Sequence, residues 1–334
     1  MPLPISFRSS VLLANAILVV FFISAFSNFT IGITATGFLL IVLRYYRLEP
    51  PEFNNVCERL GFPPGEDNST SLSPILHRAG DVYYPENTLE AIRKLKDSGA
   101  RGVEVDLAFT ADGVGILFHD MSVDRLTDDS GYVADLTYEY ISSLDVAAKH
   151  SCRPTSGVVK IPKLEECLET CLELDLMVYI DCKSKPKQTA DLLCGLFKKH
   201  PKLYNKAVVC SFFPLVIYAV RNADPRIMTG QTLRHWALQF RIYRVPEHVT
   251  KWWHAVLAPV LDVILEWSIY SWVWFLCGNS FTLICKDDLS RETCTYFRKL
   301  GSIVIPWTVN DKAEKDFFQQ SLKCPIMTDH VKDC

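Results

Sequence analysis

A repeated alternation of short β-rich runs with helical patterns, beginning near residue 73, constrains the fold of this chain more than any other feature. Such alternation implies a parallel sheet with helices packed outside it. The nine candidate strands are Pro74–Leu76, Gly102–Leu107, Gly115–Phe118, Leu176–Cys182, Ala207–Ser211, Ile227–Gln231, Phe281–Cys285, Ser302–Trp307 and Pro325–Thr328. Residues 73–334 number 262, close to the roughly 250 residues of a typical (β/α)8 barrel. We therefore expect an α/β fold whose main domain, 73–334, is a TIM barrel.

An open, doubly wound sheet is the competing architecture. The first strand is followed by neither GxGxxG nor GxxxxGK with a Ser or Thr, so the main signatures of nucleotide-binding sheets are missing. Nine candidate strands exceed the eight positions of a barrel. Because the Thr110–Gly113 turn is too short for a helical crossover, we expect one of the runs beside it to pair as a hairpin.

Polar residues gather at the carboxyl ends of the first four predicted strands, where barrel enzymes place their active sites. In chain order they are His77 and Arg78, Glu104 and Asp106, His119 and Asp120, and Asp181 with Lys183. The pattern predicts one polar site at that end of the barrel.

Glu104 and Asp106 are two residues apart, so on a strand both side chains point to the same face. With Asp181 arriving from another strand end, three carboxylates would bind Mg²⁺ or Ca²⁺ through oxygen. A solvated strand face is the alternative explanation of the pair.

His77 and His119 each follow an apolar residue and precede a charged one, which suits imidazoles that project from strand ends into a polar cavity. Two such residues beside carboxylates fit a general acid and a general base. Arg78 and Lys183 would then attract an anionic substrate, for which phosphate is the natural candidate. Structural histidines, and ion pairs between these cations and the carboxylates, are the alternatives.

Taken together, these motifs resemble those of the glycerophosphodiester phosphodiesterase family, and they cover nearly all of 73–334. With the hydrophobic amino terminus, the chain is most similar to the membrane-anchored mammalian-type members. The motifs in chain order are His77-Arg-Ala-Gly80, Pro85-Glu-Asn-Thr88, Glu104-Val-Asp106, Asp112-Gly113, His119-Asp120, Arg125-Leu-Thr127, Ile161-Pro-Lys-Leu-Glu165, Ile180-Asp-Cys-Lys183, Trp307-Thr-Val-Asn310 and Thr328-Asp329.

The resemblance implies metal-dependent hydrolysis of glycerophosphodiesters, such as glycerophosphoinositol or glycerophospho-N-acylethanolamines, to glycerol 3-phosphate and an alcohol. It implies Mg²⁺ as the cofactor, with Ca²⁺ or Mn²⁺ as alternatives. Either water attacks phosphorus directly, or the glycerol 2-hydroxyl attacks first and water opens a cyclic phosphate. The implied roles are metal ligands for Glu104, Asp106 and Asp181, acid and base for His77 and His119, and substrate or phosphate contacts for Arg78, Lys183, Glu86, Asn87 and Trp307.

Three positions depart from the family pattern. Ala79 stands where the family usually has Gly, and Lys163 replaces a common Thr. Asp181 stands where the family usually has Glu, and the shorter side chain would add a water to the metal shell or alter metal preference.

Two other functions compete with this interpretation. One is another phosphodiesterase of the same barrel group, of the phosphatidylinositol phospholipase C or sphingomyelinase D type. The other is a membrane scaffold or signalling partner whose barrel has lost its activity. The presence of His77, Glu104, Asp106 and His119 together argues against the scaffold.

The composition excludes several classes of protein. The 334 residues are 49% hydrophobic and 22% charged with a net charge of −3, so the chain is neither disordered nor suited by charge to nucleic acid. The twelve cysteines include no CxxC pair, which gives no signal for a zinc site and leaves disulfides open.

No charged residue occurs from Ser9 to Leu43, a run of 35 residues, which predicts a membrane anchor over residues 1–44. One long helix is the simplest interpretation, and a polar break at 27–30 also allows a hairpin with arms Val11–Phe26 and Ile31–Leu43. A Pro- and Gly-rich linker follows over 45–72. Flanking charges do not fix the orientation. The sequon at Asn68 favours a lumenal or extracellular catalytic domain.

A second hydrophobic segment interrupts the barrel pattern as an insertion of about 235–280. Its central part, Trp252–Cys277, contains five of the seven Trp residues. Asp262 and Glu266 lie four residues apart inside it, and such charges are costly at a bilayer centre. We expect an amphipathic helix in the membrane interface or, equally, a long helix that covers the barrel.

Overall fold

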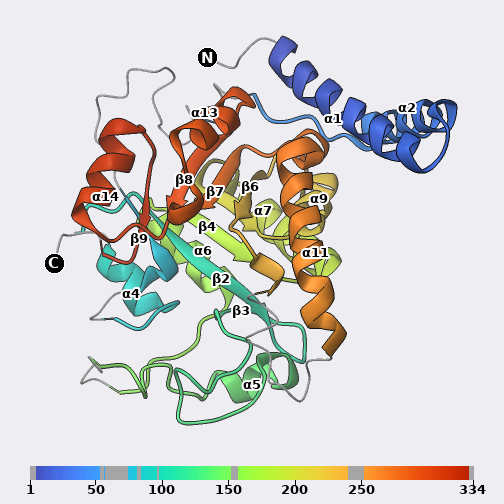
Figure 1. Ribbon diagram of the computed structural model, residues 1–334. Helices are drawn as coiled ribbons and strands as arrows, with labels where there is room; N and C mark the ends of the chain where they lie inside the picture. Colours follow the sequence, from blue (N-terminus) through green and yellow to red (C-terminus); the bar gives the residue numbers. More distant parts are fainter. Residues whose placement is uncertain are drawn as a thin grey trace.

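The structure is a computed structural model that describes residues 5–52, 56, 74–80, 84–95, 98–151, 157–239 and 252–330. The Asn68 sequon and most of the predicted linker lie outside these residues. Figure 1 shows a barrel with helices around it and a pair of amino-terminal helices that project from one end.

Eight parallel strands form a nearly closed barrel, which confirms the predicted architecture. Their order is β8-β7-β6-β5-β4-β2-β1-β9. A backbone hydrogen bond from Val309 N to Met327 O, 2.8 Å long, links the segment after β8 to β9. The strands are β1 (Ile75–Leu76), β2 (Gly102–Phe109), β3 (Gly115–Leu117), β4 (Met177–Cys182), β5 (Ala207–Ser211), β6 (Met228–Leu233), β7 (Phe281–Cys285), β8 (Ile303–Trp307) and β9 (Met327–Thr328).

The one strand outside this order, β3, is the expected hairpin partner. It pairs antiparallel with the end of β2. Thr110 closes the turn, because its hydroxyl accepts a 3.0 Å hydrogen bond from Val114 N and donates to Asp112. This pairing corrects one expectation. His119 does not lie at a parallel strand end equivalent to that of His77, since β3 returns it towards the middle of β2, where Phe118 N bonds Asp106 O.

Helices cover the outside of the barrel. The longer ones between and after the strands are α4 (Leu89–Lys94), α6 (Leu164–Glu173), α7 (Pro186–Lys199), α9 (Pro214–Ala223), α11 (Trp252–Ser268) and α13 (Arg291–Lys299). Shorter elements are α5 (Tyr138–Ile141), α8 (Leu203–Lys206), α12 (Trp274–Cys277), α14 (Lys312–Asp316), the 3₁₀ turns η1 (His77–Ala79), η3 (Val133–Asp135) and η5 (Lys286–Asp288), and the π-helical turns η4 (Ile269–Val273) and η6 (Phe317–Ser321).

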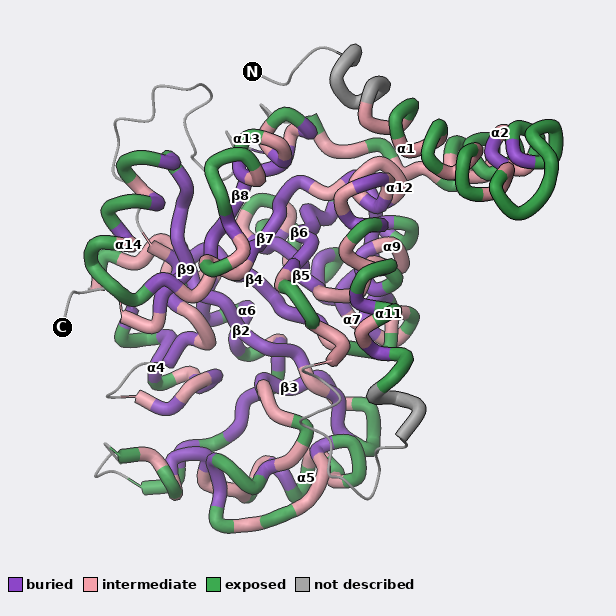
Figure 2. Tube along the Cα trace, viewed as in Figure 1, coloured by how far each residue is buried: buried purple, intermediate pink, exposed green. Residues whose placement is uncertain are grey.

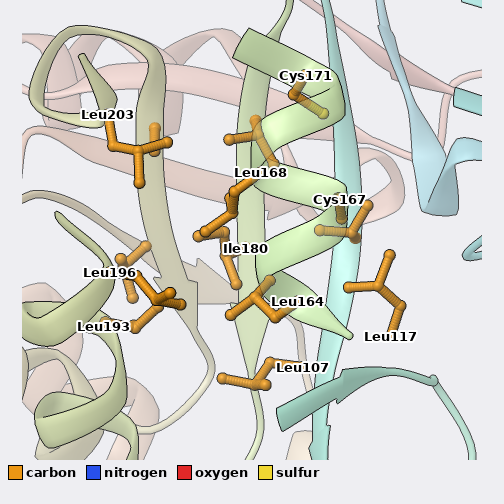
Figure 3. Close-up of a cluster of buried hydrophobic side chains, with 14 of the residues drawn as sticks. Leu107, Leu117, Leu164, Cys167, Leu168, Cys171, Ile180, Leu193, Leu196 and Leu203 are labelled. Atoms are coloured by element: carbon orange, nitrogen blue, oxygen red, sulfur yellow. The ribbon is translucent and has the colours of Figure 1, made fainter. Parts of the chain in front are cut away.

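Alternation along the buried strands separates two cores. The outward residues of β2 and β4, such as Val105 and Ile180, pack against the apolar faces of α6 and α7, where Leu168 is buried (Figure 3). The inward residues of the strands fill the barrel with a second cluster that includes Met177 and Tyr179. Because side chains alternate, the inward face of β4 continues from Tyr179 to Asp181.

The amino-terminal run forms two helices, α1 (Ile5–Phe26) and α2 (Phe29–Tyr46), so the simplest expectation of one long helix is wrong. The polar break is the reason, because Asn28 caps α2 and accepts a 2.9 Å hydrogen bond from Ile31 N. A Cβ at Gly32 would lie 2.3 Å from the Ser24 hydroxyl, which shows how closely the two helices approach.

The segment after α2 is fixed to the outer helices of the barrel. Leu48 N donates a 2.9 Å hydrogen bond to Leu276 O, and the Tyr218 hydroxyl on α9 donates to Tyr46 O at 3.0 Å. The buried guanidinium of Arg221, also on α9, donates to the carbonyl of Glu49. Figure 2 shows the resulting arrangement, with the exposed helices α1 and α2 beside α12.

The insertion is helical over Trp252–Cys277, in α11, η4 and α12. Two helical segments, Phe29–Tyr46 and Val256–Cys277, are long and apolar enough to cross a membrane. Trp272 and Trp274 are half-buried against the core between this insertion and α13, whereas Trp267 is 41% exposed.

We expect Arg221→Met to lower the free energy of unfolding by about 3 kcal/mol, because a hydrogen bond from a charged donor contributes about 1.5–3 kcal/mol. The substitution removes donors to the carbonyls of Glu49, Pro225 and Ile227. Urea unfolding of the full chain in detergent micelles measures the change. Arg93→Met, at an exposed position on α4, is the control and should change stability by less than about 0.5 kcal/mol. Equal losses in both variants would contradict this role for Arg221.

Candidate active site

Three buried carboxylates meet inside the barrel at the carboxyl end of its strands. Glu104 and Asp106 lie on the inward face of β2, and Asp181 on β4 is the direct register partner of Asp106. One oxygen from each of the three lies within 4.8 Å of the others. The parallel register of two neighbouring strands therefore brings together the three residues that the sequence predicts as a metal site.

Asp106 is the most completely bonded carboxylate of the three. Its Oδ2 accepts from Asn87 Nδ2 at 2.9 Å, and Lys183 Nζ lies 2.5 Å from its Oδ1. Asn87 also accepts from the backbone N–H of Asp106, so this amide fixes both the backbone and the side chain. Glu104 Oε2 accepts from the backbone N–H of Arg78 at 2.8 Å.

Asp181 retains bonding capacity. Its Oδ1 is buried and has no hydrogen-bond partner among the described residues, while Lys183 lies 3.7 Å from its Oδ2. A buried carboxylate oxygen without a donor is costly. The vacant acceptor and its two carboxylate neighbours form an all-oxygen set of the kind that hard divalent cations prefer, so the residues present fit such an ion.

The three carboxyl groups differ in the direction in which their pKa values are shifted. Burial and the neighbouring charge of Asp106 raise the pKa of Glu104, and burial also raises the pKa of Asp181. Burial acts in the same direction on Asp106, but the charges of Lys183 and His119 outweigh it and lower its pKa. Two of the three carboxyl groups are therefore harder to ionise than they would be in water, and a bound cation would favour their charged forms.

His119 is held at both ring nitrogens. Its Nδ1 lies 2.7 Å from Asp120 Oδ1, and its Nε2 lies 2.8 Å from Arg78 Nη2. Because a guanidinium can only donate, this contact assigns the neutral tautomer with the proton on Nδ1. Arg125 in turn bonds Asp120 and pairs with Glu86 at 2.6 Å, which fixes the carboxylate that orients the ring.

His77 has a different carboxylate partner. Its Nδ1 lies 2.7 Å from Asp329 Oδ1, just after β9, and its Nε2 lies 4.0 Å from Glu104. Asn310 Nδ2 donates to Asp329 Oδ2 at 2.7 Å, and Asn310 Oδ1 accepts from the Asp329 backbone. The last strand of the barrel thus positions the first histidine, from 252 residues away in the chain.

The pKa values of the two imidazoles are shifted in opposite directions. Burial would lower the pKa of His77, but the hydrogen bond to Asp329 and the charge of Glu104 together raise it. Burial lowers the pKa of His119, and the charge of Lys183 adds to this effect. Opposite shifts at neighbouring groups are typical of acid–base pairs.

The turn that carries His77 and Arg78 has an unusual backbone. Arg78 and Ala79 both have φ of 55°, the left-handed region that favours glycine. The family's usual Gly in place of Ala79 would relieve that strain. At Gly80, a Cβ would lie 2.5 Å from Glu86 Cα, so the close approach of these two loops requires glycine.

Glu86 and Trp307, the other two residues predicted as substrate contacts, lie in different parts of the site. Glu86 pairs with Arg78 at 3.4 Å, so it orients arginines at the site. Trp307, at the end of β8, packs edge-on against Phe212 with 5.7 Å between ring centroids. Its indole Nε1 is buried and has no partner among the described residues.

Sequence reasoning placed Asp120, Arg125, Asn310 and Asp329 in motifs but assigned them no role at the site. Their signal is positional, since Asp120 adjoins His119, and Asp329 follows the last strand. A second acidic group with a histidine, formed by Glu165, Glu169 and His200, lies near the surface between α6 and α7. Lys199 already pairs with Glu165 at 2.8 Å, so this group is largely balanced.

Comparison with known proteins agrees with this geometry. A family model described as the glycerophosphoryl diester phosphodiesterase family matches residues 77–333. Glycerophosphodiester phosphodiesterase 1 of Mus musculus is 38% identical over 300 residues, which cover 90% of this chain and 88% of the mouse protein. The Homo sapiens protein of the same name gives the same identity and coverage.

Solved structures support the fold. A putative glycerophosphoryl diester phosphodiesterase from Silicibacter pomeroyi aligns with a TM-score of 0.61 and 21% identity, covering 82% of this chain and 94% of that one. An Oleispira antarctica phosphodiesterase aligns with a TM-score of 0.59 and 17% identity, covering 78% and 94%. The family match across almost the whole barrel, with relatives 38% identical over 90% of the chain, shows that this protein belongs to the glycerophosphodiester phosphodiesterase family.

Proposed function

We propose that this phosphodiesterase hydrolyses glycerophosphodiesters, such as glycerophosphoinositol or glycerophospho-N-acylethanolamines, to glycerol 3-phosphate and an alcohol. The observation that carries the proposal is the meeting of three buried carboxylates with two histidines, each held by its own carboxylate partner. The Oleispira antarctica relative was solved in complex with sn-glycerol-3-phosphate, which supports this product.

Glu104, Asp106 and Asp181 would hold the cofactor, which we propose is Mg²⁺, with Ca²⁺ or Mn²⁺ as alternatives. When bound, a divalent cation supplies Lewis-acid stabilisation of the charge that develops on phosphoryl oxygens. The unpartnered Oδ1 of Asp181 supports its place in this set. The shorter Asp181, in place of the family's usual Glu, leaves room for an additional water ligand.

Arg78 and Lys183 are the cations that would contact the substrate phosphate. Arg78 Nη2 lies against His119, and Lys183 Nζ lies between Asp106 and the carbonyl of His119. A phosphate beside both side chains would take the place of their carboxylate partners, because it carries negative charge as the carboxylates do. Trp307 has a buried indole N–H with no acceptor among the described residues, and a substrate oxygen would supply one.

His77 and His119 would act as the acid and base pair. Each has Nδ1 on a carboxylate, Asp329 or Asp120, which fixes the ring. The Nε2 of His77 would face the reacting groups directly, and that of His119 would do so once Arg78 moves from it to the substrate phosphate. One imidazole accepts the proton of the attacking hydroxyl, from water or from the glycerol 2-position. The other donates a proton to the leaving oxygen.

We propose that the hairpin of α1 and α2 inserts into a bilayer. In an inserted hairpin, the start of α1 and the end of α2 lie on the same side of the membrane. The amino terminus and the barrel would therefore share one compartment. The Asn68 sequon supports a lumenal or extracellular location for both.

We expect His119→Ala to lower the turnover of glycerophosphoinositol with Mg²⁺ by about 10²–10⁴-fold, the usual contribution of a general acid or base. His200→Ala, which removes a histidine from the surface acidic group, should retain turnover and serves as the matched control. Release of glycerol 3-phosphate measures both rates. Undiminished turnover in the His119 variant would contradict the mechanism. A persistent cyclic phosphate as product, or release of diacylglycerol when a phosphatidylinositol vesicle is offered as the substrate, would favour the phospholipase-type alternative.

Asp181→Asn should weaken binding of Mn²⁺, used as a probe for Mg²⁺, by at least about tenfold, because the charge of one ligand is lost. Calorimetric titration of the full chain in detergent measures binding independently of activity. Asp181→Glu, the residue usual in the family, should keep affinity close to that of the parent protein. Glu169→Gln, in the surface group, should leave it unchanged; the reverse pattern would place the metal between α6 and α7.

If the barrel is lumenal or extracellular, Asn68 carries an N-linked glycan in cells that perform this modification. Treatment with an endoglycosidase should then increase the gel mobility of the parent protein and leave Asn68→Gln unchanged. The substitution is conservative in size and leaves Ser69-Thr70 in place. An identical, treatment-resistant mobility for both proteins would instead support a cytoplasmic barrel.

A further inference from the structure

We infer that the outward face of α11 is a membrane-binding surface that lies in the plane of the bilayer, beside the inserted hairpin of α1 and α2. The inference rests on the proposed membrane attachment of that hairpin. It assigns the helical insertion a partner, the acyl chains and headgroups of lipid.

The outward face of α11 is apolar along its described length. The seven large side chains that form it are between 41% and 61% exposed, and they recur every three to four residues as a single stripe. They are Val256, Leu257, Val260, Leu261, Val263, Ile264 and Trp267. An exposed apolar stripe of this extent is typical of an interaction surface.

The polarity of α11 is inverted relative to that of a helix on a water-soluble barrel. Its two acidic residues point inward: Asp262 is buried and accepts hydrogen bonds from Leu238 N at 2.8 Å and Gln239 N at 2.9 Å. Glu266 pairs with His235 at 2.8 Å. Charges towards the protein and aliphatic side chains away from it match lipid as the outer medium rather than water.

The barrel prevents this helix from crossing the bilayer, although its length and hydropathy would allow that. The strand before the insertion, β6, and the strand after it, β7, are neighbours in one sheet, with Gly230 paired to Phe281. A crossing would separate these paired strands onto opposite sides of the membrane. The hydrogen bonds of Asp262 hold α11 against the loop after β6, so its axis follows the side of the barrel.

A bilayer, rather than a second copy of the chain, is favoured by the position of the hairpin. The segment that leaves α2 is bonded to the end of the insertion, through Leu48 N to Leu276 O. The Arg47 guanidinium lies 4.6 Å from the centre of the Phe275 ring. Figure 1 shows α1 and α2 projecting on the side of the barrel that carries α11, away from α14. Lipid that receives the hairpin therefore reaches α11.

The test places a fluorescent label in the full chain, reconstituted into phosphatidylcholine vesicles that contain nitroxide-labelled lipid. Single cysteines at Leu257→Cys and Ile264→Cys carry an environment-sensitive maleimide dye, and the parent protein reports the background from native cysteines. Ile33→Cys, exposed on α2, reports insertion of the hairpin, and Ala313→Cys, exposed on α14, is the water-facing control.

We expect several-fold greater quenching at positions 257 and 264 than at 313. At the two α11 positions, nitroxides near the headgroup should quench most strongly. The two α11 positions are about 10 Å apart along a helix axis, so an in-plane helix gives them equal depth and a crossing helix does not. Quenching at 33 with none at 257 and 264 would overturn the inference and leave the hairpin anchor intact. No quenching at 33 would refute the anchor itself. Blue-shifted but unquenched emission from α11 would indicate a protein cover and also overturn the inference.

Discussion

The burial of three carboxylates inside one end of the barrel is the constraint on which the rest of the site depends. Asp106 and Asp181 face each other across neighbouring parallel strands, so their repulsion cannot be relieved by movement of either backbone. The surrounding groups supply part of the compensation, for example Lys183 beside Asp106 and the Arg78 N–H on Glu104. The divalent cation that we propose for this site would offset the repulsion that remains.

The same constraint explains the shape of the turn after β1. To place its backbone N–H on Glu104 and its guanidinium on His119, Arg78 must adopt a left-handed conformation, and Ala79 follows it. Strain of this kind costs about 1–3 kcal/mol and persists where the surrounding contacts over-determine it. Asn87, itself at φ of 59°, ties the next loop to Asp106, so two strained loops and one carboxylate share a single network.

Much of this arrangement could be predicted from the sequence, because strand alternation and motif order are local signals. The strands, the barrel and the convergence of Glu104 with Asp106 follow from periods of two and from strand ends. The distant partners of the histidines could not be derived in this way. Asp329 reaches His77 only because β9 pairs with β1, and His119 meets Arg78 only because the β2–β3 hairpin returns it to the turn after β1. Both contacts join residues through tertiary register, which no local pattern records.

The amino-terminal hairpin also shows how far the structure can be predicted from local sequence patterns. A charge-free run favours a membrane anchor but does not fix the number of helices, and it is a local polar break at Asn28 that divides the run. In the proposed insertion of two helices instead of one, the amino terminus and the barrel share one side of the membrane. An in-plane α11 then keeps the whole barrel against the surface from which the hairpin enters. Asp262 of α11 is bonded to the loop after β6, which lies at the carboxyl end of the barrel, so substrates that derive from membrane lipids would reach the mouth of the barrel along that surface.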